Sequence, residues 1–381
     1  MELTDIRKEI DGIDDGMVRL FMRRMQLAAE VAAQKRGSGQ AVLDPARERE
    51  ILAKVARQVG PELENGARLL MTTLMSVSRG LQQSALARNS AFGDMLSKAA
   101  AEAPARFPSA ASVACPGSEG GYAQQAVSSF VQFPSIFYFR DFDSVFAAVE
   151  RGMCEYGVLP IENSAVGSVT QVYDLMAKHD FKIVKAAKLR VRHVLLAPAG
   201  VELDAVKEVW SHPHALAQCS EFLRSRPELR PVPAANTATA AEMLAQSGRR
   251  DAAVIASREC AALYGLEVKL DDISDTASNF TRFICISRRC EIYTDANKFS
   301  LMMSLPHRPG SLSDVLVRFS AVGVNLTKLE SRPVPGSDFE FRFIFDFEAS
   351  PRDDRVVKLL SSFANDPEIE HFTFLGAYSE R

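Results

Sequence analysis

The apolar residues of the first hundred positions recur at intervals of three and four, which is the spacing of one face of an α-helix. The stripe from Leu3 to Val31 predicts a first helix over residues 4–35, roughly 48 Å long at 1.5 Å per residue. The rest of a domain of this size cannot cover so long an apolar face. The pattern therefore also predicts a partner subunit.

Two more helices are predicted to follow. The second begins at "LDPARERE", where Asp44 is a suitable N-cap, and it ends at Gly60-Pro61. The third is predicted from the mid-60s into the 90s, and the Ala- and Pro-rich stretch after it is typical of a linker. We predict a helical domain over residues 1–96 and a linker over 97–110.

From about residue 111 short apolar runs alternate with helical segments, which is the layout of an α/β domain. Several runs lead directly into polar loops, as in "VLPIENSAVGSV" and "SHPHALAQCS", and open α/β sheets bind ligands at such strand ends. Near residue 291 the pattern resets to a β-α-β-β-α-β order, typical of a ferredoxin-like module. These patterns predict an α/β domain over 111–290 and a small regulatory or binding module over 297–381.

Composition narrows the function without naming it. The chain of 381 residues has a formal charge of −3, which gives no reason to expect nucleic acid or an anionic membrane as a partner. The charged start "MELTDIRKEI" predicts no signal peptide, and no apolar run reaches membrane-spanning length. Six scattered cysteines without a CxxC pair favour reduced thiols and a cytoplasmic location over disulfides or a zinc site.

Charged residues interrupt the apolar faces of the predicted helices. Arg24 and Lys35 occupy positions where the stripe of the first helix calls for apolar residues, and both lie on one helical face. Taken singly, such residues more often form registry ion pairs or extend to solvent. Taken together, the cations outnumber the nearby carboxylates, so this surface predicts an anionic ligand such as a small dicarboxylate. The polar residues of these faces are Arg7, Arg24, Lys35, Asp44, Arg47, Glu48, Ser78 and Gln82.

These residues, in "IRKEIDGIDDGMVRLFMRRMQLAAEVAAQK", "DPARERE" and "SRGLQQ", resemble the all-helical chorismate mutases over residues 3–86. The resemblance implies an intertwined dimer in which Arg7 crosses to the partner's site. It assigns Arg7, Arg24, Arg47 and Ser78 to the substrate carboxylates, Lys35 and Gln82 to the ether oxygen, and Glu48 with the Asp44 backbone to the hydroxyl. The implied rearrangement of chorismate to prephenate needs no metal, cofactor or nucleophile, and it gains from cations placed where negative charge develops.

Four separated motifs of the middle domain resemble the prephenate dehydratases: "VLPIENSAVGSV", "SHPHALAQCS", "NTATAAE" and "NFTRFICIS". The resemblance implies a two-lobed fold like that of periplasmic binding proteins and the conversion of prephenate to phenylpyruvate. It makes Thr281 the principal catalytic hydroxyl and Arg282 a contact for a substrate carboxylate. The other cleft residues that it implies are Asn163, Ser164, Ser211, Gln218, Thr239 and Phe283.

Two local features of this domain concern a zinc site and the one departure from the family pattern. His212 and His214 lack the further ligands that a zinc site needs, so they are interpreted as loop residues. The first strand leads into "CPGSEGGYAQQA", in which Gly120 and Tyr122 match the family pattern but Gly121 replaces its small hydroxyl residue.

The C-terminal segment resembles the ACT amino-acid-binding modules that give prephenate dehydratases feedback inhibition by phenylalanine. Gly310 is predicted at a helix start, where free backbone N–H groups can receive a carboxylate. Arg332 would otherwise be a surface residue at a strand-loop corner. The implied effector residues are Gly310, Ser311, Leu312, Asn325, Glu330, Ser331, Arg332 and Pro333.

The leading hypothesis is a bifunctional chorismate mutase–prephenate dehydratase without cofactor, regulated by L-phenylalanine and assembled as a homodimer or a dimer of dimers. One alternative is a dehydratase that prefers arogenate. An alternative of another class is a non-catalytic amino-acid sensor whose helical part serves only for dimerisation. A dehydrogenase as the second activity is disfavoured because no GxGxxG follows a candidate strand.

Overall fold

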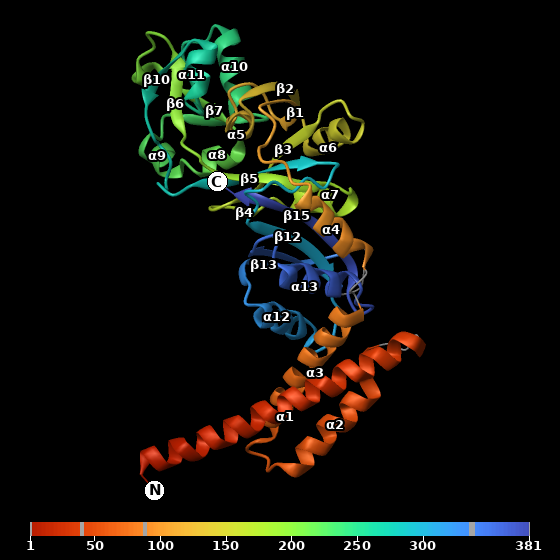
Figure 1. Cartoon of the computed structure of the whole chain (residues 1–381). Helices are drawn as coiled ribbons and strands as arrows, with labels where there is room; N and C mark the ends of the chain where they lie inside the picture. Colours follow the sequence, from red (N-terminus) through yellow and green to blue (C-terminus); the bar gives the residue numbers. More distant parts are fainter. Residues whose placement is uncertain (1, 39–41, 87–89, 335–339, 381) are drawn as a thin grey trace. The chain divides into compact units, whose positions relative to one another are not determined.

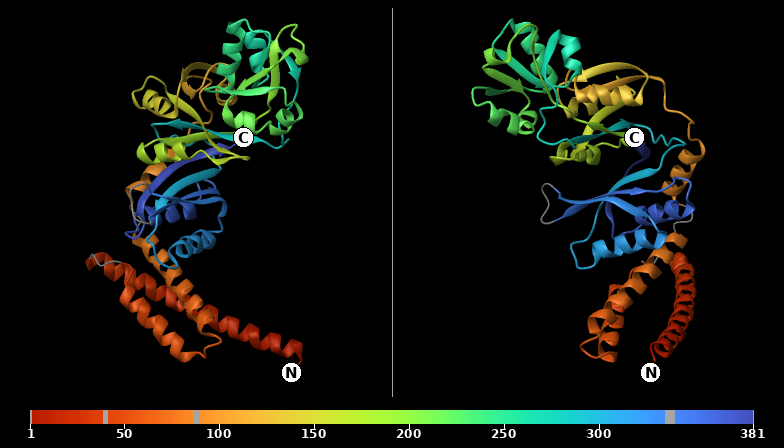
Figure 2. Two further views of the ribbon diagram at one scale, coloured as in Figure 1. Left: turned by 180° about the vertical axis from the view of Figure 1, so that it is seen from behind. Right: turned by 90° about the vertical axis from the view of Figure 1, so that its left-hand side faces the viewer.

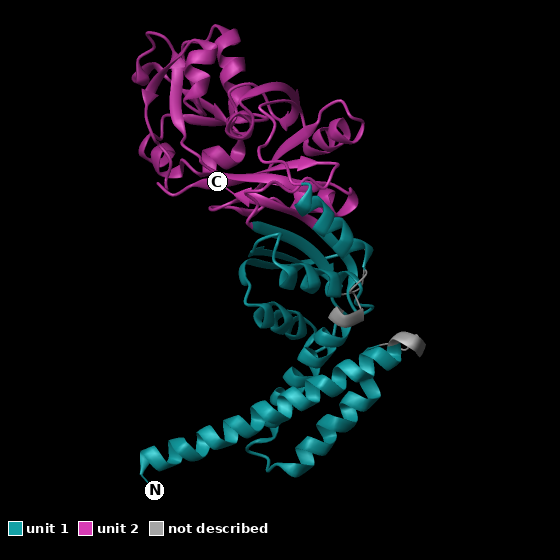
Figure 3. Cartoon of the chain, in the orientation of Figure 1, with its two compact units in different colours: residues 1–102, 298–374 teal, residues 103–297, 375–381 magenta. Residues whose placement is uncertain are grey.

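The computed structural model describes residues 2–38, 42–86, 90–334 and 340–380. The chain separates into two compact units (Figure 3). Unit 1 comprises residues 1–102 and 298–374, and unit 2 comprises residues 103–297 and 375–381. The N-terminal helices therefore pack with the C-terminal module, although two hundred residues separate them in sequence.

Four helices form the N-terminal part of unit 1 (Figure 1): α1 (Leu3–Ser38), α2 (Pro45–Gln58), α3 (Glu64–Leu86) and α4 (Ala91–Ala101). The Asp44 side chain caps α2 by accepting from the Arg47 amide, as predicted. The third predicted helix is wrong in extent: Ser90 caps a separate helix, α4, whose last residues fall within the predicted linker. The N-terminal part of α1 extends past α2 and α3 (Figures 1 and 2) and exposes its apolar stripe, including Ile13 at 57% and Leu20 at 73%.

The C-terminal part of unit 1 has the predicted β-α-β-β-α-β order. Its elements are β12 (Lys298–Ser304), α12 (Ser311–Val322), β13 (Asn325–Pro333), β14 (Phe341–Glu348), α13 (Asp354–Ala364) and β15 (Glu370–Glu380). Strand β14 pairs antiparallel with both β12 and β13. The helix α4 packs closely on α13, because a Cβ added at Gly93 would lie only 2.7 Å from the Ser361 hydroxyl.

Unit 2 contains two lobes. The sheet of the first has the strand order β5-β11-β3-β1-β2, with the short β4 on β3 and the last residues of β15 parallel to β5. Its elements are β1 (Ala110–Pro116), α5 (Tyr122–Phe130), β2 (Phe133–Phe139), α6 (Phe142–Glu150), β3 (Tyr156–Asn163), β4 (Gly167–Ser168), α7 (Thr170–Lys178), β5 (Lys182–Arg190) and β11 (Phe280–Ser287).

The second lobe is an insertion between β5 and β11, with the strand order β10-β6-β9-β7-β8. Its strands are β6 (Val194–Pro198), β7 (Glu208–Ser211), β8 (Arg230–Pro233), β9 (Ala252–Ala256) and β10 (Leu266–Leu270). Its helices are the short 3-10 helix η2 (Leu203–Ala205), α8 (Pro213–Ala217), α9 (Ser220–Ser225), α10 (Thr237–Ser247) and α11 (Glu259–Tyr264). Fully buried aliphatic residues of β6 and β9 form its core, as their continuous apolar runs predict.

In the part of the chain that the structure describes, no helix combines the length and apolar character needed to cross a bilayer. The same residues contain no cluster of three or more histidine, cysteine, aspartate or glutamate side chains arranged to hold a metal ion.

Candidate active and effector sites

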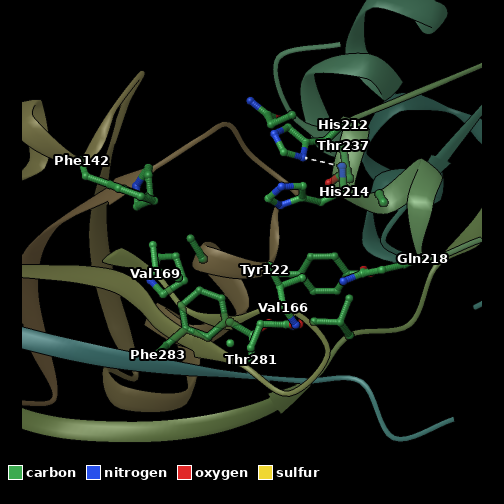
Figure 4. Close-up of a pocket in the computed structure, with 18 of the residues that line it drawn as sticks. Tyr122, Phe142, Val166, Val169, His212, His214, Gln218, Thr237, Thr281 and Phe283 are labelled. Atoms are coloured by element: carbon green, nitrogen blue, oxygen red, sulfur yellow. Dashed lines mark hydrogen bonds between the residues drawn. The ribbon is translucent and has the colours of Figure 1, made fainter. Parts of the chain in front are cut away.

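A cavity of about 680 Å³, which we call the cleft pocket, lies between the two lobes of unit 2. The first lobe contributes Asn163, Thr281 and Phe283, and the second contributes His212, His214 and Gln218 (Figure 4). The remaining polar lining residues are Tyr122, Ser168, Thr170, Gln171, His193, Asn236 and Thr237. Of the described residues that line it, none is a lysine, arginine, aspartate or glutamate.

Sheet register brings Thr281 and Asn163 together. They are opposed residues of the antiparallel pair β3–β11, at the end of one strand and the beginning of the other. The Asn163 amide donates to Thr281 Oγ1 at 2.8 Å and to Asn279 Oδ1 at 2.9 Å. The Asn163 oxygen accepts the N–H groups of Ala165 and Val166, which fixes the amide orientation. Because Thr281 accepts from Asn163, its own hydroxyl hydrogen can point into the cavity.

A chain of hydrogen bonds holds the side chain of Gln218, which belongs to the second lobe. Gln218 Oε1 accepts from Asn279 Nδ2 at 3.0 Å and lies 2.9 Å from His193 Nε2, so Nε2 carries the imidazole hydrogen. Burial lowers the pKa of His193, against an opposing effect of the Gln218 hydrogen bond. His193 Nδ1 lies 3.3 Å from the Tyr122 hydroxyl, whose pKa burial raises. The structure therefore presents a neutral imidazole at this wall of the cleft pocket.

His212 and His214 both line the cleft pocket (Figure 4), and His214 lies in the helix α8 and not in a loop. His212 is the N-cap of α8, where its Nδ1 accepts from the His214 amide at 3.2 Å. That bond leaves the Nε2–H of a neutral His212 available as a donor. Burial, followed by the proximity of His214, lowers the pKa of His212.

Four residues expected in the cleft do not line the pocket. Ser211 is fully buried and donates to the Ile255 carbonyl at 2.6 Å. Ser164 joins β3 to β11 by donating to the Ser278 carbonyl and accepting from the Phe280 amide. Thr239 lies in the first turn of α10, where its amide is capped by Asn236. These three residues support the walls of the cleft.

Arg282 is the fourth. It lies between Thr281 and Phe283, and since alternate side chains of a strand point to opposite faces, it points away from the pocket. Its Nη2 donates to the Tyr378 hydroxyl at 2.5 Å, and its Nε lies 2.5 Å from Glu380 of the terminal strand β15. This placement favours a supporting role for Arg282 over the substrate contact that the resemblance implied.

In the altered loop before α5, the Ser118 hydroxyl contacts the start of α10, outside the lining of the cleft pocket. Gly121 is the N-cap of α5 and forms no side-chain cap, but Ser118 Oγ lies 3.2 Å from Thr239 Oγ1 and 3.3 Å from Asn236 Oδ1. Gly120 has φ of 85° and would place a Cβ 2.9 Å from Cys260 Sγ, so the turn requires glycine there.

A second cavity, of about 280 Å³, lies among the N-terminal helices and is called here the helical pocket. Seven of the eight polar residues predicted for this surface line it: Arg24, Lys35, Asp44, Arg47, Glu48, Ser78 and Gln82. Arg7 does not, since it is exposed near the N-terminal end of α1. Arg79 also lines the pocket, and its side chain is only 7% exposed. Sequence reasoning missed Arg79 because it follows Ser78 directly and lies off the predicted stripe.

The cations of the helical pocket are held at different depths. Arg24 donates to the Leu74 carbonyl at 2.9 Å, and burial lowers its pKa while Glu48 opposes that effect. Lys35 donates to the Val42 carbonyl at 2.8 Å, and the Gln82 amide donates to Ser78 Oγ at 3.3 Å. Arg47 is mostly exposed and pairs with Glu50. The pocket therefore brings four cations to two carboxylates, Asp44 and Glu48.

A third cavity, of about 370 Å³, lies at the start of α12 and is called here the C-terminal pocket. It is lined by Leu305, Pro306, His307, Arg308, Pro309, Ser311, Leu312, Phe341 and Phe343. Gly310 adopts φ of 91° as the N-cap of α12. Of the predicted effector residues, Ser311 and Leu312 line this cavity, whereas Asn325 and the run Glu330–Pro333 lie on β13 outside its lining.

Three family models match the chain in succession. They are chorismate mutase type II over residues 6–83, prephenate dehydratase over 113–291 and the ACT domain over 299–365.

Characterised relatives match most of the chain. A bifunctional chorismate mutase/prephenate dehydratase of Aquifex aeolicus is 30% identical, over 99% of this chain and 98% of its own. The corresponding protein of Escherichia coli K12 is 29% identical, over 94% and 92%. An arogenate dehydratase/prephenate dehydratase of Arabidopsis thaliana is 38% identical, over 66% and 70%.

Solved structures match about 70% of the chain. A prephenate dehydratase of Arthrobacter aurescens in complex with L-Phe superposes with a TM-score of 0.63 at 30% identity, covering 70% of this chain and 89% of that one. A quorum-quenching acylase, GqqA, gives a TM-score of 0.63 at 30% identity, covering 71% and 98%. A prephenate dehydratase of Staphylococcus aureus, at 21% identity and a TM-score of 0.61, supports the fold. These matches confirm the predicted fold class.

Proposed function

We propose that this chain catalyses two successive reactions, each in its own pocket. The premise is that it belongs to the family of bifunctional chorismate mutase/prephenate dehydratases. The helical pocket rearranges chorismate to prephenate, and the cleft pocket converts prephenate to phenylpyruvate. The observation that carries the proposal is the pair of polar sites, each matched to one reaction: a cation-rich pocket for a dicarboxylate and a hydroxyl-centred cleft for loss of a ring hydroxyl.

In the mutase reaction the ether bond breaks while a carbon–carbon bond forms, and negative charge develops on the ether oxygen. Lys35 and Gln82 are assigned to that oxygen, because charge-assisted and amide hydrogen bonds strengthen as the charge grows. Arg24 and Arg47 bind the carboxylates and hold the compact conformer. Glu48 and the Asp44 backbone receive the substrate hydroxyl. The roles rest on the chemistry of the side chains that converge on this pocket.

In the dehydratase reaction the ring carboxylate leaves as carbon dioxide, and its bonding electrons move into the ring as the hydroxyl departs. Aromatisation drives the step, so the site has to stabilise the departing oxygen. Thr281 is assigned to donate to that oxygen, because Asn163 occupies its acceptor side and directs the hydroxyl hydrogen outwards. Gln218 and the neutral His212 supply further donors for the substrate.

The cleft lining supports prephenate as the substrate. Amide and imidazole donors of the lining, such as Gln218 and His212, suit the keto oxygen that prephenate carries where arogenate carries an ammonium group.

The ACT domain is proposed to bind phenylalanine as feedback inhibitor at the C-terminal pocket. The backbone N–H groups at the start of α12 can receive its carboxylate, and Leu312, Phe341 and Phe343 offer an apolar wall for its ring. The solved relative that contains L-Phe supports this ligand. Residues of β13 would complete the site from a second module in the assembly.

The assembly is proposed to be a dimer or a dimer of dimers. The exposed apolar stripe of α1 requires a partner, and Arg7 lies outside the helical pocket of its own chain. A second α1 laid along the first would cover the stripe and bring the partner's Arg7 to the pocket.

The function is tested by supplying chorismate to the purified chain and following prephenate and phenylpyruvate, with and without phenylalanine. Both products should form in sequence, and phenylalanine should slow the second. Lys35→Met should lower chorismate turnover on the order of 100-fold and leave turnover of supplied prephenate unchanged. Consumption of chorismate without phenylpyruvate would refute the dehydratase assignment. Turnover of neither substrate would favour the non-catalytic sensor.

A further inference from the structure

Arg79 joins the helical pocket to the ACT module within unit 1. Its Nη1 pairs with Glu48 of the pocket, and its Nη2 lies 2.6 Å from Asp314 Oδ2 in the first turn of α12. The three side chains are 7%, 25% and 18% exposed. A guanidinium with two carboxylates on separate nitrogens, shielded from solvent, is held in one orientation.

The helices that carry these residues pack directly against each other. At Gly80, the residue after Arg79, an added Cβ would lie 3.8 Å from Cγ of Arg318 on α12. Arg318 is itself buried and pairs with Asp366 at 2.7 Å. A shift of α12 would therefore displace α3 at the turn that carries Arg79.

A second connection runs from the C-terminal pocket to the same arginine. Arg308 lines that pocket and pairs with Glu368. Burial raises the pKa of Glu368, with Arg308 and Arg79 opposing the effect and Asp366 and Asp314 adding to it. Asp314 lies three residues after Ser311 and two after Leu312, which line the C-terminal pocket. The charged groups around Arg79 therefore include Asp314, which is close in sequence to the lining of the C-terminal pocket.

We propose that Arg79 is a further positioning residue of the helical pocket, which orients Glu48 and links it to Asp314 of the ACT module. Occupation of the C-terminal pocket then alters the mutase site through this bridge, within one chain. This inference rests on the proposed mutase and effector functions. It gives a role to Arg79, which stands in "SRGLQQ" without an assigned function, and it adds a route that bypasses the dehydratase cleft.

Two substitutions in the full chain separate the two arms of the bridge. Asp314→Asn breaks the arm to the ACT module and leaves Arg79 with Glu48. Mutase kcat/KM without phenylalanine should stay within about twofold of wild type, because Glu48 is still held. Phenylalanine should change mutase kcat/KM in the wild type but not in this variant, while dehydratase inhibition by phenylalanine persists in both. Asp354→Asn, at an exposed first-turn aspartate of α13, is the matched control and should respond like wild type.

Arg79→Gln should lower mutase kcat/KM at least about tenfold, since Glu48 loses its charged partner. Arg79→Lys retains one ammonium contact, so it should recover most of the turnover without the response to phenylalanine. A mutase response in Asp314→Asn equal to that of wild type, or full mutase activity in Arg79→Gln, would overturn the proposal.

Amide hydrogen exchange around Glu48, measured with and without phenylalanine, separates this inference from the proposed function. An effect of phenylalanine on these amides in wild type, but not in Asp314→Asn, supports the bridge even if the chain turns over no chorismate. Mutase activity together with unchanged exchange in the wild type, at phenylalanine concentrations that inhibit the dehydratase, would refute the bridge alone.

Discussion

At the scale of single residues, Thr281 depends on Asn163 for its direction. An isolated threonine hydroxyl is a poor acid, but the 2.8 Å bond from Asn163 fixes which side of the oxygen remains for the substrate. We expect Thr281→Ala to reduce dehydratase kcat on the order of 100-fold or more, with mutase turnover unchanged. Thr281→Ser keeps the hydroxyl and should retain most activity. Turnover of supplied prephenate, followed as phenylpyruvate, measures both.

Asn163→Ala provides the matched test of orientation. It leaves the Thr281 hydroxyl in place but free to rotate, so we expect a loss in kcat of about tenfold, smaller than that of Thr281→Ala. An unchanged kcat in Asn163→Ala would contradict the orienting role. Equal losses in both variants would indicate that Asn163 contacts the reacting group itself.

His193 predicts a pH dependence of stability. Burial lowers its folded pKa below the ordinary value of about 6.5, so the unfolded chain binds the proton first as pH falls. The contribution of His193 to the free energy of unfolding is complete above pH 6.5. It declines as the pH decreases towards the folded pKa, by up to about 1.4 kcal/mol per pH unit. Urea unfolding followed through Trp210, the single tryptophan and a residue of the same lobe, should show this slope. His193→Gln should flatten it, and an unchanged slope would exclude His193 as its source.

The residue assignments show what a motif can and cannot reveal. Thr281, Asn163 and Gln218 were predicted from motifs and converge on one cavity. Ser211 belongs to the same kind of motif but donates to a buried carbonyl, because a motif preserves the support of a site as well as its surface. His193 stands in none of the quoted motifs, and Arg79 stands in "SRGLQQ" without an assigned role, so only the fold shows that both line a pocket.

At the scale of elements, the sequence predicted α1 and α2 closely, since a long apolar stripe marks α1 and the Asp44 cap marks the start of α2. It failed between α3 and α4, where helix-forming residues continue and only the Ser90 cap marks a second start. It also could not predict the contacts of β15, whose last residues extend the sheet of unit 2 and approach Arg282. The strand pairing joins Ser379 to Lys185, almost two hundred positions apart, and no local pattern reports it.

From the contacts of β15 we predict that the stability of the dehydratase domain depends on the last residues of this strand. Glu380 is 13% exposed and pairs with the buried Arg282, so Glu380→Gln should leave a buried charge with less compensation. We expect a loss of about 3 kcal/mol in the free energy of unfolding of this domain. Glu370→Gln, at the exposed start of the same strand, is the control and should cost little. Equal stability of the two variants would contradict the buried pair.

At the scale of the whole molecule, α1 presents a problem that one chain does not solve. Its apolar stripe is exposed over several turns, and Arg7 lies outside the pocket that holds Arg24 and Lys35. Burial of such a stripe by a second α1 would stabilise the assembly by about 25 cal/mol per Å² of apolar surface. Each mutase site would then contain residues of two chains, which mixing two inactive variants can test.

Arg7→Ala and Lys35→Ala should each abolish most mutase activity alone. In a mixed dimer, the chain with Lys35 intact receives Arg7 from its partner, so one of the two sites is complete. If subunits exchange at random, half of the dimers are mixed, and about a quarter of the wild-type activity should return. Dehydratase turnover of the same mixture should remain at the wild-type level, because neither residue belongs to the cleft pocket. A mixture that exchanges subunits but stays inactive as a mutase would place Arg7 and Lys35 in the site of the same chain.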